Sequence, residues 1–119
     1  MMASGKLTTH VLDTARGCPA SGLQLCLFEL NGDVPTQILE TRTNHDGRVD
    51  GPLLEGFLKT GTYELRFMVA DYFKSHGIEE PNGAFLDEVP VRFVIARPDQ
   101  HYHLPLLLSP YGYSTYRGS

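Results

Sequence analysis

Alternating polarity marks this chain as one built from β-strands. Within residues 62–69 apolar side chains recur at every second position, and the same period returns within 89–96. Successive side chains of a strand point to opposite faces of a sheet, so this period gives each segment one buried face. The apolar positions are Tyr63, Leu65, Phe67, Val69, Val89, Val91, Phe93 and Ile95. The pattern predicts two half-buried strands.

Shorter runs and turn signals predict the rest of the fold. In addition to the two strands above and the five given below, a short eighth strand is expected near Val49, after the Asp46-Gly47 turn. Asp71 is predicted to cap a brief helix that Gly77 ends in a left-handed conformation. Strands of this number and spacing predict an all-β sandwich with one short helix. The five further predicted strands cover residues 7–13, 23–30, 36–43, 101–109 and 113–117.

Length and charge limit the classes of function. The 119 residues, 41% of them hydrophobic, suffice for one core, so a single domain spanning 1–119 is expected. The formal net charge of -4 comes without a basic block, which argues against a nucleic-acid partner. The longest apolar runs are far shorter than the roughly 20 residues of a membrane helix, so no membrane partner is expected.

The expected compartment is the cytoplasm. No apolar stretch near the N-terminus resembles the core of a signal peptide, and no terminal Ser-Lys-Leu address is present. The two cysteines, Cys18 and Cys26, are too few for a disulfide scaffold and lack the close pairing of a zinc site. We expect both to be reduced thiols.

Histidines in the segment 101–109 are the first candidates for chemistry. His101 and His103 fall on the strand face opposite the apolar row, whose members are Tyr102, Leu104, Leu106 and Leu108. Histidines on such a face are often ordinary surface residues. His10 has a similar position within 7–13. If the two strands are neighbours, His10 and His103 can approach each other, and one neutral imidazole could deprotonate water.

Arg48 and the last four residues complete the candidate set. Arg48 follows the Asp46-Gly47 turn and carries a planar guanidinium suited to carboxylates and polarised carbonyl oxygens, although taken alone it is an ordinary surface arginine. The tail offers a phenol, a second guanidinium, a small glycine and a terminal carboxylate, which together suit a small polar heterocycle, but termini are commonly frayed. The tail residues are Tyr116, Arg117, Gly118 and Ser119.

Two signatures at opposite ends of the chain resemble those of the transthyretin-like proteins. Residues 6–13, KLTTHVLD, together with Gly17, Cys18, Pro19 and Ala20, resemble the N-terminal signature, and residues 101–119, HYHLPLLLSPYGYSTYRGS, resemble the C-terminal one. The resemblance spans essentially the whole chain. The closing YRGS is typical of the 5-hydroxyisourate hydrolase branch, whereas vertebrate transthyretin, a hormone carrier, lacks it.

This resemblance implies a sandwich of two four-stranded sheets with one short helix. It also implies edge-to-edge dimers, two of which form a homotetramer with active sites in the groove between them. His10, Arg48 and His103 would be the catalytic set, without cofactor or metal, and the role of His101 stays open. The implied substrate-binding residues are Tyr116, Arg117, Gly118 and Ser119.

The implied reaction is hydrolysis of 5-hydroxyisourate to 2-oxo-4-hydroxy-4-carboxy-5-ureidoimidazoline in urate breakdown. Water attacks a ring carbonyl and a cyclic amide bond opens, which requires a base, an oxyanion donor and a proton for the leaving nitrogen. We assign the base to the pair His10 and His103, without choosing between them, and charge stabilisation to Arg48 and Arg117. Two alternatives remain: a carrier of a small aromatic ligand, and a metallohydrolase in which His10, His101 and His103 bind zinc.

Overall fold

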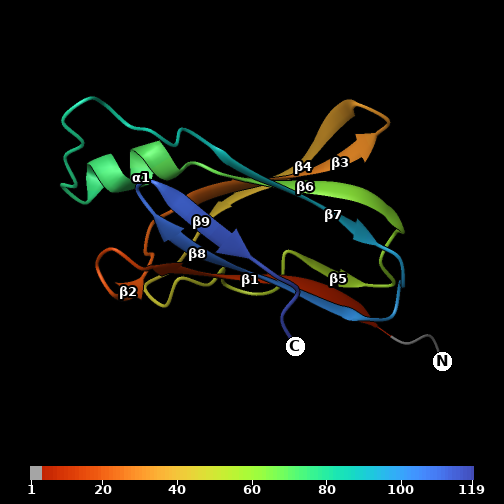
Figure 1. Cartoon of the computed structure of the whole chain (residues 1–119). Coiled ribbons are helices and arrows are strands. Elements are labelled where there is room, and N and C mark those ends of the chain that lie inside the picture. The colour runs from red at the N-terminus through yellow and green to blue at the C-terminus, as the bar shows by residue number, and fades with distance from the viewer. Residues whose placement is uncertain (1–3) are drawn as a thin grey trace.

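Two sheets packed face to face make up the chain (Figure 1). The computed structural model describes residues 4–119, in which strands dominate and one helix is present. The elements are β1 (Gly5–Asp13), β2 (Cys18–Pro19), β3 (Gln24–Asn31), β4 (Val34–Arg42), β5 (Leu54–Gly56), β6 (Gly61–Phe67), α1 (Val69–Ser75), β7 (Val89–Ile95), β8 (His101–Ser109) and β9 (Gly112–Thr115). The all-β sandwich with one short helix that the sequence predicts is confirmed.

The two sheets differ in regularity. One runs in the order β4-β3-β6-β7 with antiparallel neighbours throughout. The other runs β2-β1-β8-β9, and β5 adds a fifth strand at the edge of β1. The resemblance implied four strands in each sheet. Both sheets have four strands in their main order, and the short β5 is a fifth strand beside β1. That edge of β1 is divided along its length between β5, an isolated bridge from His10 to Arg48, and β2.

Parallel pairing of β1 with β8 joins the two ends of the chain. The ladder runs without a shift from the pair Lys6 and His101 to the pair Asp13 and Leu108. The sequence analysis treated these two strands as neighbours only conditionally, and the pairing confirms that they are. Because the strands are parallel and in continuous register, residues of one face stay side by side along the whole ladder.

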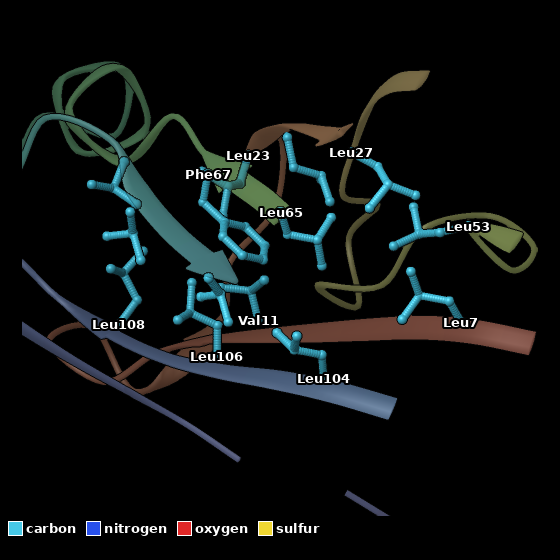
Figure 2. Close-up of a cluster of buried hydrophobic side chains, with 14 of the residues drawn as sticks. Leu7, Val11, Leu23, Leu27, Leu53, Leu65, Phe67, Leu104, Leu106 and Leu108 are labelled. Atoms are coloured by element: carbon cyan, nitrogen blue, oxygen red, sulfur yellow. The ribbon is translucent and has the colours of Figure 1, made fainter. Parts of the chain in front are cut away.

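Leucine and aromatic side chains fill the space between the sheets, as Figure 2 shows. Leu7 and Val11 of β1, with Leu104, Leu106 and Leu108 of β8, contribute one side of this core, and all five are buried. The opposite sheet contributes side chains that include Leu25, Leu27, Leu65 and Phe67. The apolar row predicted for 101–109 is therefore the inner face of β8, and the histidines lie on its outer face.

The helix begins earlier than the sequence predicts. Asp71 lies in the first turn of α1 instead of capping it, and Met68 stands at the N-cap without a side-chain hydrogen bond. Tyr72 is buried and donates a 2.8 Å hydrogen bond to Asp13, which ties the helix to the end of β1. Burial together with this bond to the carboxylate raises the pKa of Tyr72 to about 12. Packing of this kind decides where so short a helix begins.

One other expectation shifts in position. Val49 lies outside any strand, and the extra short strand is β5, five residues further on. Gly77 has a φ of 74°, as expected for the residue that ends the helix. Within residues 4–119 no helix combines the length and the apolar character needed to cross a bilayer.

Replacing Val89 with Ala tests the core. Val89 is fully buried at the start of β7, so removing two methyl groups should lower the free energy of unfolding by about 2 to 3 kcal/mol. Val34→Ala makes the same chemical change at a side chain that is 64% exposed and should change it by less than about 0.5 kcal/mol. Urea unfolding followed by circular dichroism measures both, and equal losses would contradict the assigned core.

Candidate functional site

The outer face of the β1–β8 ladder carries the candidate histidines. Thr8 lies directly opposite His103, and His10 follows two residues later on the same face of β1, opposite Pro105. His10 and His103 are half-buried, whereas His101 is exposed. The pairing therefore gathers imidazoles from residues more than 90 positions apart on one surface.

Thr8 joins two of these imidazoles. Its Oγ1 lies 2.7 Å from Nε2 of His101 and 2.8 Å from Nδ1 of His103, both within hydrogen-bond distance. The contact occupies Nδ1 of His103, which leaves Nε2 as the nitrogen available to a ligand. Gly118 lies against Cδ2 of His103, the ring carbon bonded to Nε2, so this nitrogen lies next to the C-terminal segment.

A tight turn brings Arg48 to the same face. Asn44 accepts hydrogen bonds through Oδ1 from the backbone N–H groups of Asp46 and Arg48, and its own N–H donates to the carbonyl of Arg48. Gly47 has a φ of 74° and its carbonyl accepts a 2.8 Å bond from Val11. A side chain at Gly47 would overlap the Val11 carbonyl oxygen. The Asp46-Gly47 turn is therefore what places Arg48 across from His10.

The electrostatics of this face favour the neutral form of His103. Burial lowers the pKa of His103, and the positive charge of Arg48 lowers it further. His101 and His10 act in the same direction. A neutral imidazole has one bare nitrogen that can accept a proton, and Arg48 supplies a nearby positive charge for a developing anion. The group of side chains can thus activate water and stabilise an oxyanion.

The C-terminal segment continues alongside β8 in the antiparallel register of β9 and reaches His103. Gly118 donates a 2.7 Å backbone bond to the carbonyl of His103, and the two residues form an isolated antiparallel bridge. A Cβ atom at Gly118 would lie 2.6 Å from Cδ2 of His103 and 3.3 Å from Pro105. Close contact with the imidazole therefore favours glycine at this position.

Tyr116 and Arg117 line a neighbouring cavity. The Arg117 guanidinium lies 4.3 Å from the centre of the Tyr102 ring and donates to Gln100 and to the His101 carbonyl. Both tail residues line a cavity of about 410 Å³ that His103 also borders. Strands β7 and β8 supply most of its remaining lining. His103 thus lies where the histidine face and the cavity meet.

The seven predicted site residues do not all lie together. His10, Arg48, His103 and Gly118 lie together, while Tyr116 and Arg117 reach the set through the cavity that His103 borders. Ser119 is exposed and follows Gly118 at the end of the chain. In the described part of the chain, no three His, Cys, Asp or Glu side chains are arranged to hold a metal ion.

Sequence reasoning missed two residues of this site. Thr8 has the same strand parity as His10, and this signal could have placed it beside the histidines once the partner strand was known. Asn44 precedes the Asp46-Gly47 turn, and an asparagine there can bond the backbone of residues that follow it.

Comparison with known proteins identifies the family of this chain. The profile of the HIUase/Transthyretin family matches residues 7–118. This chain belongs to that family. It is 62% identical to "5-hydroxyisourate hydrolase 2" of Rhizobium meliloti (strain 1021), covering 100% of both chains. It is 53% identical to the 5-hydroxyisourate hydrolase of Pseudomonas aeruginosa, covering 97% of this chain and 92% of the relative.

Solved structures of family members have the same fold. A structure titled (S)-allantoin synthase matches with a TM-score of 0.91 and 47% identity over 98% of this chain, which spans only 44% of that longer chain. The 5-hydroxyisourate hydrolase of Klebsiella pneumoniae matches with a TM-score of 0.79 and 33% identity, covering 97% and 94% of the two chains. Sea bream transthyretin in complex with thyroxine matches with a TM-score of 0.82 and 28% identity over 95% and 94%.

Replacing Gly47 with Ala tests how Arg48 is held. The new methyl group would overlap the Val11 carbonyl, so the turn should move and carry Arg48 away from His10. Gly51→Ala is the matched control, because Gly51 also has a positive φ, 77°, but has open space around its Cα. We expect the Gly47 variant to lose about 2 kcal/mol more unfolding free energy. Thermal and urea unfolding compare the two, and equal losses would show that backbone strain alone matters.

Proposed function

We propose that this chain hydrolyses 5-hydroxyisourate to 2-oxo-4-hydroxy-4-carboxy-5-ureidoimidazoline. The observation that carries the proposal is the half-buried His103 next to Arg48 and His10 on one sheet face, where burial and Arg48 lower the pKa of His103. Curated relatives with 62% and 53% identity over almost their full length carry the name 5-hydroxyisourate hydrolase, which supports the same substrate here. The enzyme belongs to urate breakdown in purine catabolism.

The chemistry needs three groups that this face contains. His103, with His10 beside it, takes a proton from water as the water oxygen attacks a ring carbonyl. Arg48 stabilises the oxyanion that forms, because its guanidinium stays charged and presents planar donors. The leaving ring nitrogen then recovers a proton from the imidazole pair. These roles require no cofactor and no metal.

The C-terminal segment binds the substrate in this proposal. Gly118 lets the backbone lie against His103, so that a flat heterocycle can occupy the space next to Nε2. Arg117 is held by Gln100 and by the Tyr102 ring, which gives it a defined position for binding a carbonyl oxygen or an anionic ring. Tyr116 lines the cavity, and the exposed Ser119 at the end of the same segment contacts the outer side of the substrate in this proposal.

The active unit in this proposal is a tetramer of single-domain chains. The histidine face is open, since Arg48 and His101 are exposed, and beside it Leu12 and Leu107 are 36% and 37% exposed. An apolar patch next to an open polar site is typical of a surface that another subunit covers. Strands β7 and β9 end the two sheets and leave edges for pairing with a second copy.

The proposed compartment is the cytoplasm. Cys18 and Cys26 are both free thiols, which agrees with a reducing environment.

Replacing either imidazole tests the activity. His10→Asn and His103→Asn should each lower turnover of freshly generated 5-hydroxyisourate by about 10² to 10⁴, the usual contribution of a positioned base. His45→Asn is the control, because the His45 side chain is 88% exposed in the turn before Arg48 and contacts Asp46, and the variant should retain full turnover. Ultraviolet absorbance follows substrate loss against its spontaneous decay. A wild-type protein that gives no acceleration would favour a carrier function instead.

Replacing Leu107 with Glu tests the assembly. A carboxylate in the centre of a covered apolar surface is costly, so the variant should dissociate into smaller species. The control is Val34→Glu, at a position 64% exposed on the outermost strand β4. Sedimentation velocity should give about four times the 13.2 kDa chain mass for wild type and control. A wild-type monomer, or a Leu107→Glu tetramer, would contradict the proposed assembly.

A further inference from the structure

The Thr8 hydroxyl has a position that its ordinary role as a strand residue does not explain. Oγ1 lies between Nε2 of His101 and Nδ1 of His103, at 2.7 and 2.8 Å. A hydroxyl carries one proton and two lone pairs, so it can donate to one imidazole while it accepts from the other. Thr8 and His103 form one cross-strand pair of the ladder, and His101 lies two residues before His103 on β8. Backbone pairing therefore holds the relative position of the three side chains.

The donors and acceptors of this trio allow two hydrogen-bonding states. In the first, His103 donates from Nδ1 to Thr8, and Thr8 donates to Nε2 of His101, which leaves Nε2 of His103 bare. In the second, His101 donates from Nε2 to Thr8, and Thr8 donates to Nδ1 of His103, whose remaining proton is on Nε2. The first state presents a base on the substrate side, and the second presents an acid.

We propose that His103, Thr8 and His101 form a proton relay that carries the charge of catalysis from the substrate side to solvent, with Thr8 as its positioning residue. The inference rests on the hydrolysis proposed above and assigns to His101 a role that the sequence left open.

The step conserves protons and involves no change of oxidation state. Water gives a proton to Nε2 of His103, and its oxygen forms a bond to the ring carbonyl carbon. The Nδ1 proton of His103 moves to the Thr8 oxygen, and the Thr8 proton moves to Nε2 of His101. His101 becomes the cation, the substrate becomes the oxyanion, and the reverse sequence returns a proton to the leaving nitrogen when the ring bond breaks.

The environments of the two imidazoles favour this direction. Burial and the nearby Arg48 lower the pKa of His103, so a positive charge on that ring is costly. His101 is exposed, and water can solvate the same charge there. His103 alone would be a weak base, whereas passing the charge to His101 increases the driving force for removing the proton from water.

Variants of Thr8 test the bridge through turnover. Thr8→Val keeps the shape and removes the hydroxyl, so kcat should fall by about 10- to 100-fold while KM changes little. Thr8→Ser restores the hydroxyl and should recover most of kcat. Thr14→Val makes the same change in a threonine that donates to the Leu108 carbonyl beyond the far end of the ladder, and it should leave kcat unaltered. Wild-type kcat in Thr8→Val would overturn the proposal.

His101 distinguishes a relay from simple orientation of His103. His101→Ala should lower kcat about as much as Thr8→Val, and the double variant should be no slower than either single variant, because each change interrupts the same path. In mixtures of H₂O and D₂O, the dependence of kcat on deuterium content should be curved for wild type and linear for Thr8→Val. Normal kcat in His101→Ala, or losses that multiply in the double variant, would overturn the relay.

Ring nitrogen spectra separate this inference from the proposed function. Long-range ¹H–¹⁵N spectra report which imidazole nitrogen carries the proton, without any substrate. Thr8→Val should change the signals of both His101 and His103, and Thr8→Ser should change neither. Unaltered His101 signals in Thr8→Val would overturn the bridge. Inactive wild-type protein would overturn the hydrolysis itself, whereas active wild-type protein with a fully active His101→Ala variant would overturn only the relay.

Discussion

Parallel pairing of β1 with β8 is the interaction on which the core and the candidate site both depend. Its inner face supplies Leu7, Val11 and Leu106 to the space between the sheets, while its outer face holds Thr8 opposite His103. Burial of the inner face fixes the register, because a slip by one residue would exchange the two faces of a strand. The same hydrophobic burial that stabilises the sandwich therefore sets the distances between the polar groups on the other side.

Segments attached to this ladder complete the site without forming long elements of their own. The turn at Gly47 brings Arg48 against His10, and Gly118 brings the C-terminal segment against His103. Both glycines are needed for steric reasons, since a Cβ at either position would collide with β1 or β8. Function thus lies in short irregular segments that a rigid pair of strands positions, as is common for binding and catalytic groups.

Much of the fold follows from local sequence alone. The strand His101–Ser109 has the predicted bounds, and six other strands lie within two residues of their predicted starts and ends. The predictions were less accurate where tertiary contacts decide the position of an element. α1 begins at Val69 because Tyr72 packs and bonds to Asp13, and the extra strand forms at β5 because β1 has a free edge there. His76, just after α1, contacts Arg16 and the Ser21 carbonyl, partners that no local pattern indicates.

By itself, the sequence determined which residues form strands, which face of each is apolar, and which signatures mark the family, because these depend on neighbours within a few positions. Only the tertiary structure decided that β1 lies beside β8, that Thr8 bridges His101 and His103, and that Arg117 turns toward Tyr102. The physical reason is that periodicity reports the direction of a side chain but not its partner. Partners across more than 90 residues are chosen by packing of the whole core.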